Sequence, residues 1–356
     1  MSLPDAVTIS LLGDVVLLTP LARLRHADDG GFDAALAELR MSDLVLANLE
    51  IPLSRRGYRV PKMANLRADP EIIEDVRAMG IHVVALANNH MMDYGPSAML
   101  DTLAACDSVG IAHCGAGIDL SSALEPAIVD VNGRRIAVLN VSCTLPAESE
   151  AADGKPGIAP IHIVTSYEAD PGMLLEQPGT VPLVHTSVVP ADQERVCQII
   201  TTLRERVDTL IIGVHWGAPS HWLSPYQGTL AEYQQPLGQA LIDAGADVVW
   251  GHHSHELDPI EFYQGKPIFY SLGHFLLEEP WDFMGPESMI ARLTIGQDGH
   301  LAAIEIIPLR IDIRGLPQRA AGDDAALVLR QLAARSESLG TRMKIADDRA
   351  LVLFDV

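Results

Sequence analysis

Basic residues are scarce in this 356-residue chain, which has 25 Lys and Arg against 47 Asp and Glu and a formal net charge of −22. A surface with that balance repels nucleic acid and anionic membranes, because both carry dense negative charge. We therefore expect neither of them as a partner. The acidity also serves simple solubility, so on its own it identifies no ligand.

Cysteines are few, and long apolar runs are missing. The four cysteines are Cys106, Cys114, Cys143 and Cys197. No pair has the CxxC spacing of a zinc or redox motif, so free thiols in a reducing compartment are expected. No stretch approaches the roughly 18–20 apolar residues of a membrane span, and Asp5 stands where a signal peptide needs positive charge. We expect a cytoplasmic protein.

Segments that predict strands alternate with segments that predict helices for much of the chain. Turn signals and hairpins follow from about residue 257 onward. This order favours an α/β architecture with a mixed sheet, in a single domain over 1–356. We expect an insertion or lid at 144–185, where no periodicity is clear, and a C-terminal elaboration at 311–356. The expected strands are 6–13, 42–50, 82–90, 208–217 and 246–256, and the expected helices are 32–39, 70–79, 96–107, 191–207, 230–245 and 324–339.

Polar residues fall where the expected strands end. In open α/β sheets, sites form beyond the carboxyl ends of strands, so neighbouring strands would bring these side chains together. Imidazole and carboxylate groups suit Zn, Mn, Fe or Ni, and the set is large enough for one or two divalent ions. The residues concerned are Asp14, Glu50, Asn89, His90 and His215 on four segments, and His252, His253 and His255 on a fifth.

Taken singly, most of these motifs have a structural explanation. A Gly-Asp pair after a strand is usually a turn, and Asn88-Asn89-His90 can cap one with its side chains. The His-Trp-Gly that begins at His215 is more specific. Three imidazoles within the GHHSH run at 251–255 are rarely structural. All five motifs in this order favour a metal site.

These motifs also resemble the bacterial capsule-synthesis CapA family, whose members are associated with poly-γ-glutamate production. That family in turn is similar to the calcineurin-like metallophosphoesterases. The resemblance extends over roughly residues 7–350 and implies a four-layer α/β/β/α sandwich with mixed sheets and metals at the strand tips. The matching segments are GD at 13–14, NLEIPL at 48–53, Lys62, LANNHMMDYG at 86–95, HWG at 215–217, GADVVWGHHSH at 245–255 and GKPIFYSLGHF at 265–275.

The resemblance assigns roles residue by residue. His90 would be the general acid beside the ions, with Asp93 orienting its ring. Glu50 would bridge the ions, where the phosphoesterases have Asp. The remaining ligands would be Asp14 and His255 for the first ion, and Asn89, His215 and His253 for the second.

Three departures from the family patterns lie near the site, one of them at Ala218, where an acidic residue commonly follows His-Trp-Gly. Val16 stands where the phosphoesterases have a metal-binding His, which leaves the first ion short of a ligand. His274 replaces the usual Asn of the SLGNF segment and adds an imidazole that we include among the catalytic residues.

Substrate contacts are expected on both sides of this site. Lys62, in a family motif, and Arg67 would hold a carboxylate or phosphate, although a surface salt bridge is the alternative for Arg67. His221, Trp222 and Tyr226 follow His215 in a Pro- and Gly-containing segment and would line a pocket. Ordinary core packing is the alternative for the two aromatic residues.

Three functions fit these residues. The first is hydrolysis of a phosphoester or amide by metal-activated water, with His90 as the acid. The second is epimerisation of a peptide, in which flanking imidazoles such as His221 and His274 remove and return a Cα proton. The third is binding or assembly of a γ-glutamyl polymer. The substrate would be a small molecule or a peptide, and the sequence leaves the oligomeric state open.

Overall fold

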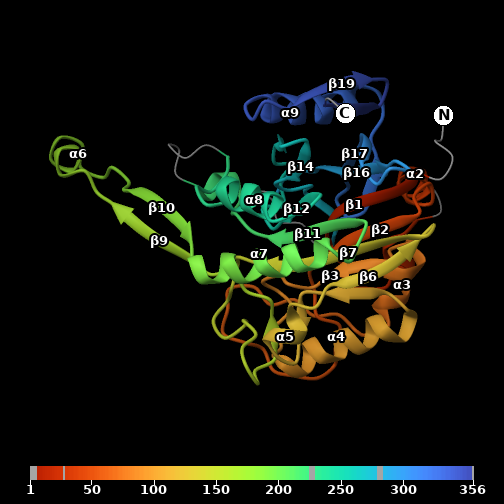
Figure 1. Ribbon diagram of the computed structural model, residues 1–356, viewed down its shortest axis with the longest axis horizontal. Helices are drawn as coiled ribbons and strands as arrows, with labels where there is room; N and C mark the ends of the chain where they lie inside the picture. Colours follow the sequence, from red (N-terminus) through yellow and green to blue (C-terminus); the bar gives the residue numbers. More distant parts are fainter. Residues whose placement is uncertain (1–5, 27–28, 224–228, 279–283, 355–356) are drawn as a thin grey trace.

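The structure is a computed structural model that describes residues 6–26, 29–223, 229–278 and 284–354 (Figure 1). The larger of its two main sheets has the strand order β19-β20-β17-β16-β1-β2-β3-β4, with β15 beside β1 and β18 beside β17. Strand β1 pairs in parallel with β2 and β15 and antiparallel with β16. The strands are β1 (Val7–Val16), β2 (Leu44–Leu49), β3 (Val83–Ala85), β4 (Ala112–Cys114), β15 (His274–Leu277), β16 (Glu287–Ile295), β17 (Leu301–Ile311), β18 (Pro317–Arg319), β19 (Arg342–Ala346) and β20 (Arg349–Leu353).

The second main sheet has the order β13-β14-β12-β11-β7-β6. Its four central strands are parallel, and a hairpin strand pairs antiparallel at each edge. Such central strands are buried on both faces, which explains the unbroken apolar runs before His215 and His252. The strands are β6 (Ala127–Val131), β7 (Arg134–Ser142), β11 (Thr209–His215), β12 (Val248–His252), β13 (Ile260–Tyr263) and β14 (Lys266–Phe269).

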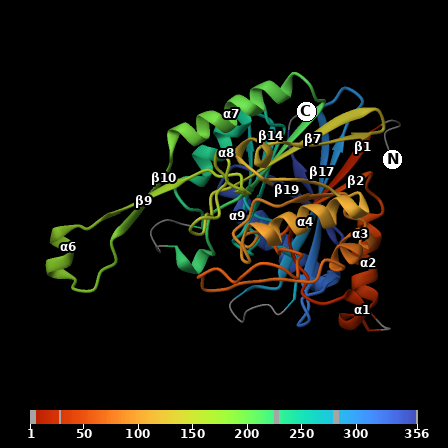
Figure 2. The same ribbon diagram turned by 90° about the horizontal axis from the view of Figure 1, so that it is seen from below.

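Two hydrophobic clusters hold the sheets together, and each includes residues of both sheets. Because side chains alternate along a strand, Leu46 and Ile211 belong to one cluster, whereas Ala47 and Ile212 belong to the other, which also includes many helix residues. Figure 2 shows α7 and α8 on one side of the strands and α2 and α3 on the other. The helices of the body are α1 (Leu21–Leu24), α2 (Gly30–Leu39), α3 (Ile72–Ala78), α4 (Pro96–Val109), α5 (Leu120–Ala123), α7 (Pro190–Arg204), the 3-10 turn η1 (Ser220–Trp222), α8 (Gln234–Asp243) and α9 (Gly322–Glu337).

The segment expected to be an insertion contains regular structure. A short strand β8 (Gly157–Ile158) pairs with β5 (Ala116–Gly117), and then β9 (Ile163–Glu168) and β10 (Leu183–Val188) form a separate two-stranded ribbon. Helix α6 (Pro171–Glu176) joins them at the tip. Figures 1 and 2 show this ribbon projecting from the body. Its residues are mostly exposed on both faces, so they carry no alternating pattern in the sequence.

Two further expectations need correction. The expected strand 82–90 is paired only over Val83–Ala85, after which the chain turns, because the Asn88 side chain accepts the backbone N–H groups of His90 and Met91. The helix expected from Pro70 begins at Ile72, after a turn. None of the helices in the described residues combines the length and the hydropathy of a membrane span.

Candidate metal centre

The two sheets meet where β1 passes β12. The Trp250 indole donates a hydrogen bond of 2.8 Å to the Leu12 carbonyl, which joins the strands just before their polar ends. Close backbone approach requires glycine at this point: a Cβ on Gly13 would lie 2.0 Å from the Gly273 carbonyl oxygen, and one on Gly251 would lie 2.1 Å from that of Tyr270. The carboxyl ends of β1, β2, β11 and β12 therefore place their polar side chains in one small space.

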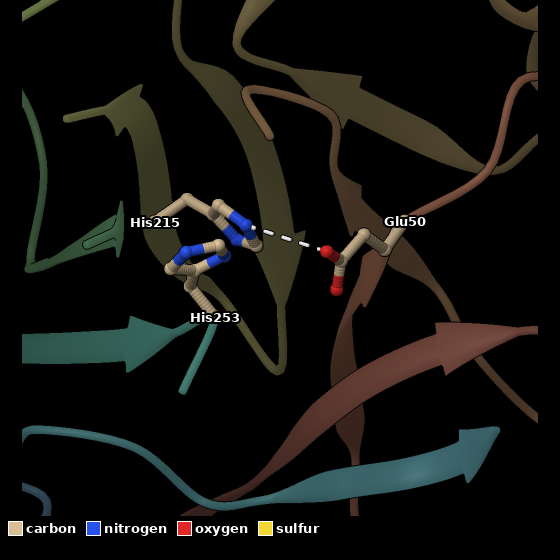
Figure 3. A group of neighbouring side chains, drawn as sticks. All are labelled: Glu50, His215 and His253. Carbon is tan, nitrogen blue, oxygen red and sulfur yellow. Dashed lines mark ion pairs between the residues drawn. The ribbon is translucent and has the colours of Figure 1, made fainter. Parts of the chain in front are cut away.

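Glu50 lies at the centre of that space and belongs to two groups of potential metal ligands. One group is Glu50, His215 and His253, and the other is Asp14, Glu50 and His255. In each group the ligand atoms all lie within 4.8 Å of one another. Figure 3 shows the first group, in which the Glu50 Oε1 atom is 3.4 Å from His215 Nε2. The same oxygen is 4.0 Å from His255 Nε2 in the second group.

Several atoms of these groups have no protein partner. Both carboxylate oxygens of Glu50 and the Nδ1 atom of His253 are buried without a hydrogen bond among the described residues. Buried polar atoms are nearly always paired, so these unpaired atoms are the ones with lone pairs to offer a metal ion. Asn89 adds its Oδ1 atom, 2.7 Å from His215 Nε2. Two carboxylates, three imidazoles and an amide oxygen are a donor set that fits divalent transition metals.

The charges of the metal-free centre depend on one another. Burial opposes ionisation of Asp14, but the nearby His255 imidazole outweighs it and holds the pKa of Asp14 below its ordinary value. Burial and the Asp14 charge raise the pKa of Glu50 to about 8. Burial alone would lower the pKa of His255, but the two carboxylates raise it to about 9. Burial lowers the pKa of His215 to about 3, which leaves that ring neutral and free to bind a metal.

His90 faces a pocket beside the ligands. The pocket is lined by Glu50, His90, His255 and Glu278 and by apolar residues, among them Val16 and Leu66. The His90 Nδ1 atom is 2.7 Å from the Asp93 carboxylate. The structure thus brings His90 and Asp93 to the same edge as the metal ligands.

Lys62 points inward to the same group. Its ammonium donates to Asp93 Oδ1 at 2.6 Å and to the Asn89 carbonyl, and it lies 3.3 Å from His90 Nδ1. The side chain is only 15% exposed. Lys62 therefore contacts the proposed acid and its orienting carboxylate, rather than standing free for a substrate anion.

His274 is placed next to Asp14 within the sheet. The two residues are partners in the β1–β15 register, and the His274 ring centre is 6.1 Å from that of His255. The side chain is 1% exposed, and burial lowers its pKa to about 3. His252 is buried as well, with its ring 4.3 Å from that of Trp250. Both rings are neutral neighbours of the ligands.

The remaining predicted substrate residues lie toward the surface. The Arg67 guanidinium is 4.1 Å from the centre of the Tyr94 ring and donates to the Arg56 carbonyl. His221 and Trp222 form η1, with ring centres 5.5 Å apart, and His221 Nδ1 is 3.7 Å from a Glu256 oxygen. Tyr226 lies outside the described residues.

Two supporting amides were missed by the sequence analysis. The Asn48 amide donates to Asp14 Oδ1 at 2.7 Å and lies 3.4 Å from His215 Nδ1. The Asn88 amide donates to Asn48 Oδ1 at 3.1 Å, which holds Asn48 in place. Side chains alternate along a strand with a period of two residues, which puts Asn48 and Glu50 on the same face. This period was the sequence signal that could have identified Asn48.

Comparison with known proteins identifies the family. A family model described as "Bacterial capsule synthesis protein PGA_cap" matches residues 8–279. The chain is 27% identical to the capsule biosynthesis protein CapA of Bacillus anthracis, with 97% of this chain and 77% of that protein covered. It is 29% identical to the PGA biosynthesis protein CapA of Bacillus subtilis strain 168, with 78% of this chain and 65% of that protein covered.

A third relative is matched almost end to end. It is the probable polyglutamine synthesis accessory protein of Mycobacterium tuberculosis, 30% identical, with 98% of this chain and 96% of that protein covered. The chain spans less than two thirds of the Bacillus subtilis relative. The family model nevertheless matches most of the chain, and the chain belongs to the CapA family of bacterial capsule synthesis proteins.

Proposed function

We propose that this protein is a metal-dependent hydrolase that cleaves a phosphoester or an amide of a small molecule or peptide. The observation that carries the proposal is the Glu50 carboxylate, which is buried, unpaired and common to two groups of ligands. A carboxylate shared in this way would help to hold two ions, which together would activate a water or polarise a substrate oxygen.

The ligand groups divide between two ions. Asn89, His215 and His253 would hold one ion and Asp14 and His255 the other, with Glu50 between them. Divalent ions bound there would polarise a substrate oxygen and supply a water nucleophile at neutral pH. Asn48 holds Asp14 in position through its hydrogen bond, as outer partners of metal ligands commonly do.

His90 would supply the proton to the leaving group. Asp93 fixes the ring through Nδ1, which leaves Nε2 as the atom that can exchange a proton with a substrate. Lys62 pairs with Asp93 and so compensates the buried charge of this carboxylate. The pocket beside His90 is the place where the substrate would lie.

The relatives support a glutamyl amide as the first substrate to test, because two are named for capsule or PGA biosynthesis and one for polyglutamine synthesis. We further propose the four-layer arrangement of the calcineurin-like phosphoesterases, with helices outside two facing sheets. The hydrophobic clusters shared by the two sheets and the positions of α2, α3, α7 and α8 support that arrangement.

Epimerisation is the weaker alternative. It needs a second proton-transfer group that faces the substrate opposite His90. His274 is buried within the sheet, and His221 lies beside Glu256 in η1, so the geometry favours hydrolysis over epimerisation.

The test uses the full chain purified without chelator. Metal content is measured first, and the protein is then offered a γ-glutamyl oligopeptide and a chromogenic phosphodiester in D2O. We expect cleavage of one of them, dependent on metal and lost in Glu50→Gln. If deuterium were incorporated at Cα of an uncleaved peptide, the activity would be epimerisation and not hydrolysis. If the peptide bound tightly without any turnover, the protein would be a binding protein and not an enzyme.

A further inference from the structure

The projecting ribbon, which we call the arm, consists of residues 163–188 and lacks the support of a core. It comprises β9, α6 and β10, and β9 and β10 form a sheet of only two strands. Two-stranded ribbons are marginally stable in water, and a helix as short as Pro171–Glu176 is unstable on its own. Six residues of strand extend the arm by about 20 Å, enough to reach past the body of the molecule. The arm therefore gains stability from any surface that packs against it.

The surface of the arm suits a partner that is both apolar and basic. Leu175 at its tip is 84% exposed, and Tyr167 and Met173 are exposed too. The arm contains Glu168, Asp170 and Glu176 but neither Lys nor Arg, and of the three carboxylates Glu168 pairs with His185 of the arm and Asp170 caps helix α6. An anionic membrane would repel such a surface, so a membrane is not the favoured partner.

This chain has a surface of the opposite kind. Residues 54–67, which we call the basic loop, contain four arginines and Lys62 but no acidic residue. The loop also exposes Tyr58 and Met63, the latter to 81%. Among the described contacts, those of Arg59 and Arg67 are with the neutral Asn65, the Arg56 carbonyl and the Tyr94 ring. These two guanidinium groups are thus the ones that an incoming carboxylate can pair with.

Both surfaces are connected to the end of the molecule that carries the metal centre. The arm follows β7, whose last residue, Ser142, is the register partner of His215. Ile161, two residues before the arm, donates its N–H to the Ser142 carbonyl. The basic loop borders the pocket, because Leu66 lines it and Lys62 contacts His90.

We propose that this chain forms a two-fold dimer in which the arm of each copy packs across the basic loop of the other, at the rim of the partner's metal centre. Apolar contacts of the arm tip with the loop and carboxylate pairs with Arg59 and Arg67 hold it there. The arm then acts as a lid in trans. The rest of the surface is acidic, so two copies that met through other faces would repel each other.

The first test is the oligomeric state of the full chain, measured by sedimentation velocity over a range of concentrations. The wild type is expected to be a dimer, and Leu175→Asp and Arg59→Glu are each expected to shift it to monomer. The double variant Arg59→Glu/Glu176→Arg exchanges the positive charge of the loop and the negative charge of the arm, and it should restore the dimer. The matched control is Ile313→Asp, at a residue that is 94% exposed outside both surfaces, and it should leave the dimer intact. Unchanged metal content in all variants shows that they are folded.

The second test asks which surfaces meet. Leu175→Cys and Met63→Cys proteins are mixed and treated with a short bismaleimide, with wild-type protein as the control for the native thiols. Cross-linked dimer should form in the mixture well above its level in either variant alone. A monomeric wild type would overturn the proposal, as would a dimer that survives both Leu175→Asp and Arg59→Glu. Monomers that bind lipid vesicles would overturn it in favour of a membrane surface.

Discussion

Both groups of potential metal ligands include Glu50, so a change at this residue would affect an ion held by either group. Glu50→Gln keeps the size of the side chain but removes the negative charge that an ion needs. We expect this variant to lose most of its metal, as measured by elemental analysis of protein purified without chelator. Glu278→Gln is the matched control, because its carboxylate accepts hydrogen bonds from Leu18 and Thr19 and belongs to neither group. Full metal content in Glu50→Gln would show that the carboxylate is structural.

The two ions should differ in affinity. In the proposed assignment Asn89, His215 and His253 would join Glu50 around one ion, whereas only Asp14 and His255 would join it around the other. Val16 lines the pocket next to Glu50 and His255 and offers no donor atom. Calorimetric titration of stripped protein should therefore show a tight and a weak site. Asp14→Asn should abolish the weak one and Val16→His should strengthen it, whereas two equal affinities would contradict the assignment.

His90 is expected to act on the substrate and not on the fold. His90→Ala should keep its metal and lower kcat by about 10²- to 10⁴-fold, the usual contribution of a general acid or base. His113→Ala is the control, since that ring pairs with Asp107 near the surface. Loss of soluble protein with unchanged kcat in the remainder would instead indicate a structural role for His90.

At the scale of elements, one buried glutamate connects several segments that are distant in sequence. Glu38, near the end of α2, accepts hydrogen bonds from Arg292 of β16, Arg319 of β18 and Arg349 of β20. Glu38→Ala would leave the buried Arg292 with Glu305 as its remaining carboxylate partner, and it should lower the free energy of unfolding by about 2 kcal/mol.

The matched control for Glu38 lies on the same helix. Asp33 pairs with Arg25 at the surface, so Asp33→Ala should cost no more than about 1 kcal/mol. Denaturant unfolding measures both variants. An equal effect of the two would mean that the Glu38 network adds no more stability than a surface ion pair.

How much could be predicted from the sequence also depends on the element. Apolar runs place β1, β2, β11 and β12 correctly because these strands are buried on both faces, and their polar ends then indicate the ligands. The arm could not be predicted in the same way, since an exposed ribbon buries no face and leaves no periodic pattern. The inward orientation of Lys62 was not predictable either, because it depends on Asp93, which is distant in sequence and adjacent only in the fold.

The whole molecule should respond to pH through its metal centre when the ions are removed. In the metal-free protein, burial raises the pKa of Glu50 to about 8. Burial would lower the pKa of His255, but the neighbouring carboxylates outweigh it and raise that pKa to about 9. Both groups bind their proton more tightly in the folded chain than in the unfolded one. Their contribution to stability is therefore complete below their unfolded pKa values and is lost as the pH rises through 8 and 9.

The buried neutral imidazoles act in the opposite direction at lower pH. Burial lowers the pKa values of His215, His252 and His274 to about 3, so their contribution is present above the ordinary value of 6.5 and is lost as the pH falls. The metal-free protein should thus be most stable near pH 6.5 and lose stability between pH 6.5 and 9.

Denaturant unfolding of chelator-treated protein at a series of pH values measures this dependence. Bound ions replace the protons of the ligands, so protein reloaded with metal should lose much less stability over the same range. Glu50→Gln, which cannot ionise, should lose less than the wild type when both are metal-free. A metal-free wild type whose free energy of unfolding stays constant or rises from pH 6.5 to 9 would mean that Glu50 and His255 do not hold the protons assigned to them.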